Sequence, residues 1–383
     1  MVDFTVMTGV KASLGGILLG IAASIHYLSY HRLTGASGLM EKVVQQGTSP
    51  WQVAFCIGVF HAATIYIAAT GGITLMRIPY YFFIIGGLLI GFGSRLGNGC
   101  TSGHGICGLS RFNLRSYVAV GTFMATAVIT ANLLHHSHTY EYNSGGSSLA
   151  TSDWLNYNQY LGWAMFVILS LVVLRDVFDI FYPADLESYG TANTRISALK
   201  EIIVMYLVGG IFGTGLSLSG MINNGVVLNF LTFNKNWDPS LIFVLGWSVM
   251  VFGAVFWYDY FQRAEGTVVA NSSEVNALNG EEAQQISPQP LQREASTPLD
   301  PGKPVDTKLV IGAALFGIGW GVSGICPAPA ISILSVPACA IFFIPACVVG
   351  IKLVAVYSAH FEVDGTKEAP LSGIDATASP SKD

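Results

Sequence analysis

The chain has 383 residues, of which 52% are hydrophobic and only 11% are charged, and its formal net charge is −5. Soluble domains usually carry about 25% charged residues, so this composition excludes an ordinary soluble protein, and the small, scattered charge argues against binding to nucleic acid. We therefore expect an all-α polytopic membrane protein, and we expect it in the plasma membrane.

Long apolar segments recur along the whole chain. Several approach the roughly 20 residues that a membrane-spanning helix needs, and others are shorter by about a third. We expect about nine long apolar helices plus short half-helices. The apolar segments are 9–28, 51–70, 80–93, 116–134, 158–174, 199–216, 240–258, 307–320 and 337–357.

Polar stretches separate these segments. Residues 136–157 are rich in Ser, Asn and His, and the absence of Lys and Arg from 116–174 places this loop outside the cell by the positive-inside rule. Residues 176–198 then form a cytoplasmic loop. Residues 261–306 carry Glu, Gln, Ser and Pro with few large apolar side chains, which predicts a disordered linker, and 358–383 predict a disordered tail.

Two halves of the chain resemble each other. "GFGSRLGNGC" at 91–100 aligns without gaps with "GIGWGVSGIC" at 317–326. A second pair lies upstream in each half, where "GILLG" at 16–20 resembles "GGIFG" at 209–213. Two matches in the same order favour a duplication. We expect two pseudo-symmetric, inverted repeats, 9–134 and 199–357, with a loop, an extra helix and a cytoplasmic loop at 135–198 between them.

A Gly- or Pro-rich break with a cysteine beside it follows a short apolar segment in each half. Non-helical backbone survives at membrane depth only when protein buries it or it lines a cavity, and such paired breaks are the best sequence indication of a transport site. We expect re-entrant loops here; close helix packing through glycine is the alternative. The residues expected to shape the breaks are Gly91, Gly93, Gly99, Gly103, Gly317, Gly319, Pro327 and Pro329.

The cysteines could serve several chemistries. Cys100, His104 and Cys107 form C-x3-H-x2-C, which suggests a zinc or haem site, but a fourth ligand is not evident and the glycine-rich run predicts a floppy loop. A thiol–disulfide oxidoreductase is less favoured, because the chain contains no C-x-x-C. Neutral thiols are weak S–H donors that suit a sulfur-bearing solute. We therefore expect neither metal nor cofactor.

The remaining cysteines and histidines have plainer interpretations. Cys56, Cys339 and Cys347 read as small buried hydrophobes, and Cys107 could already belong to helix packing. His135, His136 and His138 form a short cluster in the outer loop. A solvated loop is a simpler explanation for this cluster than a metal trap.

"GFGSRLGNGCTSGHGICGLSR" and "GIGWGVSGICPAPA" resemble the two signatures of the YeeE/YedE sulfur-transport family, which many bacteria carry on separate half-length proteins. The resemblance covers both halves but neither the linker nor the tail. It implies inward transport of thiosulfate or a related reduced sulfur species through a constriction lined by thiols, here Cys100 and Cys326. Ala328 departs from the glycine that is common in the family pattern, and residues 9–40 contain no further cysteine.

Other residues near the breaks are candidates for contact with the solute. Asn98, Ser102 and Ser323 could donate hydrogen bonds to its oxygens or satisfy loop backbone. Arg95 and Arg111 could raise the local anion concentration or reach the membrane interface. His104 is a candidate for a hydrogen-bonding role behind the thiols.

Two rival functions stay open beside the transporter. The first is a channel for another small anion or a selenium compound. The second is a membrane thiol enzyme that accepts sulfane sulfur as a persulfide and passes it to a downstream sulfur-accepting protein. We favour the transporter over the enzyme.

Overall fold

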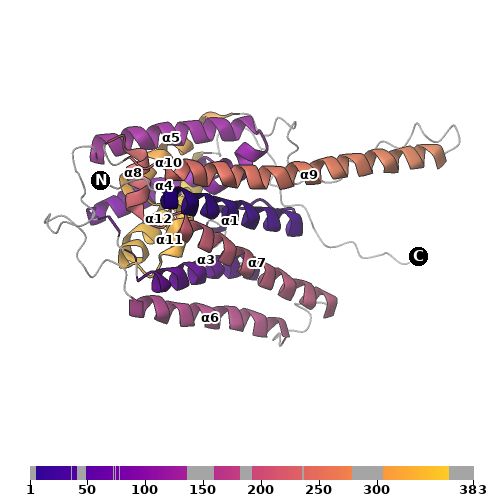
Figure 1. The fold of residues 1–383 in the computed structure, drawn as a ribbon, viewed down its shortest axis with the longest axis horizontal. Helices are drawn as coiled ribbons and strands as arrows, with labels where there is room; N and C mark the ends of the chain where they lie inside the picture. The colour runs from indigo at the N-terminus through magenta and orange to yellow at the C-terminus, as the bar shows by residue number, and fades with distance from the viewer. Residues whose placement is uncertain are drawn as a thin grey trace.

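The computed structural model describes residues 6–35, 37–40, 49–71, 73, 75–76, 78–135, 159–181, 192–234, 237–277 and 305–361, and every regular element among them is helical. Each predicted apolar segment forms a helix (Figure 1). The long helices are α1 (Val6–Tyr30), α3 (Pro50–Ala69), α4 (Tyr80–Leu96), α5 (Leu114–His135), α6 (Gln159–Phe181), α7 (Ala192–Leu218), α9 (Ser240–Ala277), α10 (Thr307–Ser323) and α12 (Ile344–Phe361). The short elements are η1 (Thr101–Gly108), α8 (Asn224–Leu231), α11 (Pro327–Ser332) and η3 (Ala338–Phe343).

The protein is an integral, multi-pass membrane protein. Six stretches of the described chain are long and apolar enough to cross a bilayer, namely 8–30, 50–69, 114–135, 195–218, 240–263 and 338–356. The pair α4 and η1 passes the same criterion together but is bent by 48° at its break, the geometry of a broken span or a re-entrant loop. The apolar stretches 160–175 in α6 and 307–323 in α10 are shorter.

Glycines let the long helices approach backbone to backbone. An added Cβ at Gly16 of α1 would overlap the backbone of Val244 in α9, and one at Gly209 of α7 would overlap the backbone of Phe55 in α3. Small residues at such interfaces allow the close contacts that hold helices together in lipid. The pairs α1–α9 and α3–α7 are therefore tightly packed, and each runs parallel.

Helices α4 and α10 pack against each other at the centre and run antiparallel. Gly86 near the start of α4 faces Gly319 near the end of α10, whereas Gly93 near the end of α4 faces Gly312 near the start of α10. Helix α12 packs on the other side of α4, and α5 packs on the other side of α10. This central group carries both chain breaks.

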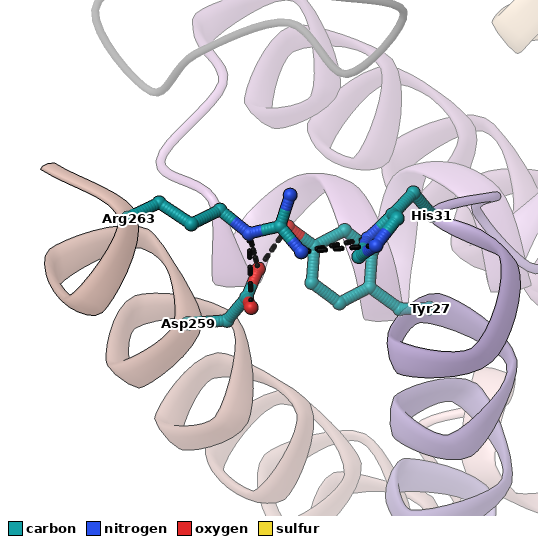
Figure 2. A network of polar contacts seen from close by, with 4 residues as sticks. All are labelled: Tyr27, His31, Asp259 and Arg263. Atoms are coloured by element: carbon teal, nitrogen blue, oxygen red, sulfur yellow. Dashed lines mark hydrogen bonds and ion pairs between the residues drawn. The ribbon is translucent and has the colours of Figure 1, made fainter. Parts of the chain in front are cut away.

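The ends of α1 and α9 are joined by a polar network (Figure 2). The Tyr27 hydroxyl donates to Asp259 at 3.0 Å, and the Arg263 guanidinium bonds the same carboxylate through Nε at 2.9–3.0 Å. Arg263 Nη2 also lies 2.9 Å from Nε2 of His31, at the end of α1. This network fixes the two helices beside each other at the end of the bundle from which α9 projects (Figure 1).

The structure corrects several predicted boundaries. Helix α6 continues to Phe181 and α7 begins at Ala192, both within the predicted cytoplasmic loop 176–198, and α12 continues to Phe361 within the predicted tail. Helix α9 continues to Ala277, so residues 261–277, which were expected to belong to the disordered linker, are helical. Their high content of polar residues hid this continuation, because the apolar pattern ends near residue 258. Residues 278–304 and 362–383, the rest of the predicted linker and most of the tail, lie outside the described residues, as do the predicted outer loop 136–157 and residues 182–191 of the predicted cytoplasmic loop.

Candidate functional site

The first break lies between α4 and η1. After α4 ends at Leu96, the chain turns through Asn98 in the left-handed region, with φ 55°. Cys100 then takes an extended conformation, with φ −133° and ψ −170°, as the N-cap of η1. The glycine-rich run that was expected to be floppy is in fact a π-helix of 8 residues.

The second break repeats this path. Helix α10 ends at Ser323, and Gly324 turns the chain in the left-handed region with φ 68°. Cys326 is the extended N-cap of α11, with φ −99° and ψ 165°. Pro327 occupies the first turn of α11, where a missing N–H costs no helical hydrogen bond.

The two thiols lie in closely related surroundings. Cys100 is 2% exposed and Cys326 is 3% exposed, and neither side chain caps its own helix. The sulfur of Cys100 lies 3.2 Å from the hydroxyl of Ser102, and the hydroxyl of Thr101 donates to the sulfur of Cys326 at 3.8 Å. The first turn of η1 therefore contacts a thiol from each half of the chain.

A cavity of about 430 Å³ reaches both breaks. Most of its wall is aliphatic or aromatic and comes from α5, α7 and α9. At roughly 30 Å³ per water molecule in the liquid, it has room for a small hydrated solute. The residues that the breaks contribute to the wall are Thr101, Ser102, Gly105, Ile106, Ala328 and Pro329.

His104 holds the first break together. Its Nε2 lies 3.3 Å from the carbonyl oxygen of Gly97 and its Nδ1 lies 3.0 Å from the hydroxyl of Ser116. A carbonyl can only accept, so Nε2 carries the proton, and Nδ1 of the neutral ring accepts from Ser116. Gly99 is needed because any Cβ there would overlap the imidazole. The role predicted for His104 behind the thiols stays a prediction.

The residues of the metal alternative have other partners in this structure. Both nitrogens of His104 are used in hydrogen bonds, and the Cys107 thiol donates to the Thr34 carbonyl at 3.6 Å. Within the described ranges, no three His, Cys, Asp or Glu side chains gather as a metal site would require.

Two of the residues predicted to donate hydrogen bonds to the solute, Ser323 and Asn98, have structural roles in the backbone of the breaks. The hydroxyl of Ser323 donates to the Gly319 carbonyl at 2.9 Å inside a fully buried contact, so its hydrogen is already used within α10. Asn98 is exposed and adopts a conformation for which asparagine and glycine are the favoured residues. Its position therefore has a structural cause independent of any solute.

The two arginines lie in different settings. Arg95 is half-buried in the last turn of α4. Arg111 is only 7% exposed, donates from Nε to the Cys107 carbonyl at 2.9 Å, and stacks over the ring of Phe256 at 6.0 Å. A cation at the C-terminal end of a helix balances its carbonyls, so Arg111 closes η1 rather than extending toward bulk water.

The glycines of the breaks differ in what they permit. A Cβ at Gly91 would overlap the Cys347 carbonyl, and one at Gly317 would overlap the Phe123 carbonyl. Gly93 and Gly319 lie in the α4–α10 contact described above. A Cβ at Gly103, by contrast, would meet nothing within 4 Å, so packing does not require glycine at that position.

The other cysteines lie inside helices, and one member of the predicted histidine cluster is buried. Cys339 and Cys347 are buried and Cys56 is partly buried, all as free thiols. His135 belongs to the core and not to the outer loop, since it is buried and its Nε2 lies 3.2 Å from the Gly321 carbonyl oxygen. His136 and His138 lie outside the described residues.

Three residues near the site were not foreseen. Thr101 contacts Cys326, Ser116 positions His104, and Trp320 lines the cavity. Thr101 could have been suspected from its place beside Cys100 at a helix start. Ser116 and Trp320 offered no such signal, because their roles depend on the crossing of distant helices.

Comparison with family models divides the chain in two. A family described as "Sulphur transport" matches residues 4–129. A family described as of unknown function (DUF6691) matches residues 200–272 and 291–363. No solved structure matches the chain significantly.

Curated relatives from Xylella fastidiosa are named as probable transporters. One from strain Temecula1 is 33% identical over 123 residues, which are 32% of this chain and 91% of the relative. A second from the same strain is 35% identical over 144 residues, or 37% of this chain and 80% of the relative. One from strain 9a5c is 37% identical over 133 residues, or 34% of this chain and 73% of the relative.

Proposed function

Because the chain belongs to the YeeE/YedE family of sulfur transporters, we propose that it takes up thiosulfate or a related reduced sulfur species through a constriction formed by the thiols of Cys100 and Cys326. The observation that carries this proposal is their matched placement. Both cap a half-helix after a left-handed turn, and Thr101 contacts Cys326 across the two halves.

The chemistry follows from what a buried thiol can offer. A neutral thiol is a weak donor and its sulfur is a weak acceptor, so it can hydrogen-bond a solute that carries both sulfur and oxygen without holding it tightly. Transport needs binding that is weak enough for release. Passage from one thiol to the other by exchange of hydrogen bonds requires no covalent step.

The two-repeat architecture is part of the same proposal, with residues 9–134 and 199–357 as the repeats. The alignment that pairs the two cysteines also pairs Gly86 with Gly312. Under it, the contact of Gly86 with Gly319 is matched by the contact of Gly312 with Gly93. The α1–α9 contact is matched in the same way by α7–α3, and α4–α12 by α10–α5.

The orientation of these contacts favours inverted repeats. Helices α4 and α10 are counterparts and run antiparallel, as a pseudo-twofold axis in the membrane plane requires. An axis along the membrane normal would make them parallel. The half-length relatives, each covered for most of its length by about a third of this chain, fit a fusion of two such halves.

Uptake of labelled sulfur sources by a sulfur-auxotrophic host tests the proposal. Expression of the chain should confer saturable uptake of thiosulfate, competed by unlabelled thiosulfate and not by sulfate. Absence of uptake above an empty-vector control, with the protein folded in the membrane, would overturn it. Mass spectrometry of Cys100 after exposure to thiosulfate adds a second criterion: a stable added sulfur atom would indicate the persulfide enzyme instead.

A further inference from the structure

Two hydroxyl-bearing residues at the start of η1 lie between a largely apolar cavity and the thiols. Cys100 and Cys326 do not line the cavity, whereas Thr101 and Ser102 do. Each hydroxyl contacts one of the sulfurs behind it, Thr101 at 3.8 Å from Cys326 and Ser102 at 3.2 Å from Cys100. A solute that enters from the cavity therefore reaches these two residues before it reaches a thiol.

Both of these residues belong to the first half of the chain. The residues that follow Cys326 are Pro327 and Ala328, which carry no hydroxyl and no donor in their side chains. Of the two hydroxyls, that of Thr101 connects the two halves of the chain, because Thr101 lies in η1 and its hydroxyl donates to the sulfur of Cys326, the N-cap of α11. This contact must break if the two breaks are to part.

We propose that Thr101 is a gating residue of the constriction, an inference that rests on the proposed function. In the resting state its hydroxyl donates to the sulfur of Cys326. When an oxygen-bearing sulfur anion arrives, the hydroxyl turns to an oxygen of the anion, because a charged oxygen is a far stronger acceptor than a thiol sulfur. The Cys326 thiol is then released to contact the solute.

Substitutions at Thr101 distinguish the effect of its hydroxyl on uptake from the effect of its side-chain shape. Thr101→Val keeps the shape and removes the donor, so thiosulfate uptake at limiting concentration should fall at least about tenfold. Thr101→Ser keeps the donor and should stay within about threefold of the wild type. The matched control is Thr214→Val, whose hydroxyl donates only to the Gly210 carbonyl of its own helix at 2.9 Å, and which should transport normally.

A cross-link tests the gate directly. Thr101→Cys places a thiol beside Cys326, and an oxidant such as copper phenanthroline should join the two sulfurs, as mass spectrometry of the linked peptides would verify. The linked protein should stop transporting, and dithiothreitol should restore uptake, while oxidant leaves wild-type uptake unchanged. Continued uptake by the linked protein would overturn the gate.

The outcomes distinguish this inference from the function beneath it. If Thr101→Val transports like the wild type while Cys100→Ala does not, Thr101 is no gate and the thiol constriction stands. If Cys100→Ala also transports normally, the thiol constriction itself is wrong. Normal gel-filtration profiles for Thr101→Val and Thr101→Ser establish that the comparison concerns folded protein.

Discussion

Asn98 and Gly324 turn the chain through the same left-handed backbone conformation, with φ 55° and 68°, each two residues before the cysteine that begins a half-helix. Left-handed backbone strains residues with a Cβ, and β-branched residues most of all. The two turns thus explain why the sequence places asparagine at one position and glycine at the other.

Substitutions at these turns should follow that backbone preference. Asn98→Gly should leave thermal stability in detergent unchanged, whereas Asn98→Val should lower it, with a strain of about 1–3 kcal/mol. Gly324→Ala should be worse still, because its Cβ would also overlap the Asn224 carbonyl and Leu228. A thermal-shift series measures the order, and equal stability of Asn98→Val and Asn98→Gly would refute the left-handed turn.

Two glycines of the breaks should respond in opposite ways to the same substitution. Gly91→Ala should impair folding, because the added methyl overlaps the Cys347 carbonyl between α4 and α12. Gly103→Ala should fold normally, since its methyl meets nothing within 4 Å. Yield of monodisperse protein on gel filtration compares them, and a Gly91→Ala protein as well behaved as Gly103→Ala would contradict the packing described for α4.

Much of the fold could be predicted from the sequence. Each apolar segment became a helix, and both breaks fell where glycine, proline and cysteine interrupt the apolar pattern. The reason is physical: backbone in lipid must bond within its own helix, so that hydrophobic length and helix breakers define the spans. The continuation of α9 to Ala277 was missed because it lies beyond the apolar pattern.

The side-chain partners within the site could not be predicted. Ser323 and Thr101 both lie beside a break, yet the first bonds its own helix and the second reaches the opposite cysteine. Which partner each hydroxyl finds depends on how α4 and α10 cross. The sequence around each residue does not predict that crossing. The same holds for the pairing of His104 with Ser116.

The His104–Ser116 pair should act as one unit. Because the Ser116 hydroxyl donates to Nδ1 while Nε2 donates to the Gly97 carbonyl, His104→Ala and Ser116→Ala should each lower stability. Their combination should cost less than the sum, with a coupling of about 0.5–3 kcal/mol. A double-mutant cycle in detergent measures this, and strictly additive losses would show that the two side chains do not interact.

The segment 278–304 should tolerate shortening, given the composition-based prediction of a disordered tether. Loop closure changes slowly with length, and about fifteen Gly/Ser residues have an r.m.s. reach of roughly 20 Å. Replacing the segment by such a chain, with α9 kept intact to Ala277, should preserve folding and uptake. Aggregation of the shortened protein on gel filtration would mean that the segment packs against the membrane domain.

The thiol constriction is tested most directly by the initial rate of labelled thiosulfate uptake in Cys100→Ala, with Cys56→Ala as its matched control at equal protein level in the membrane. Cys100 sits at the head of η1 against the Ser102 hydroxyl, whereas Cys56 lies within α3 as a packing residue. We predict that Cys100→Ala abolishes uptake without loss of folded protein and that Cys56→Ala stays within about twofold of the wild type, the size of a small packing change. Full uptake by Cys100→Ala would contradict the account.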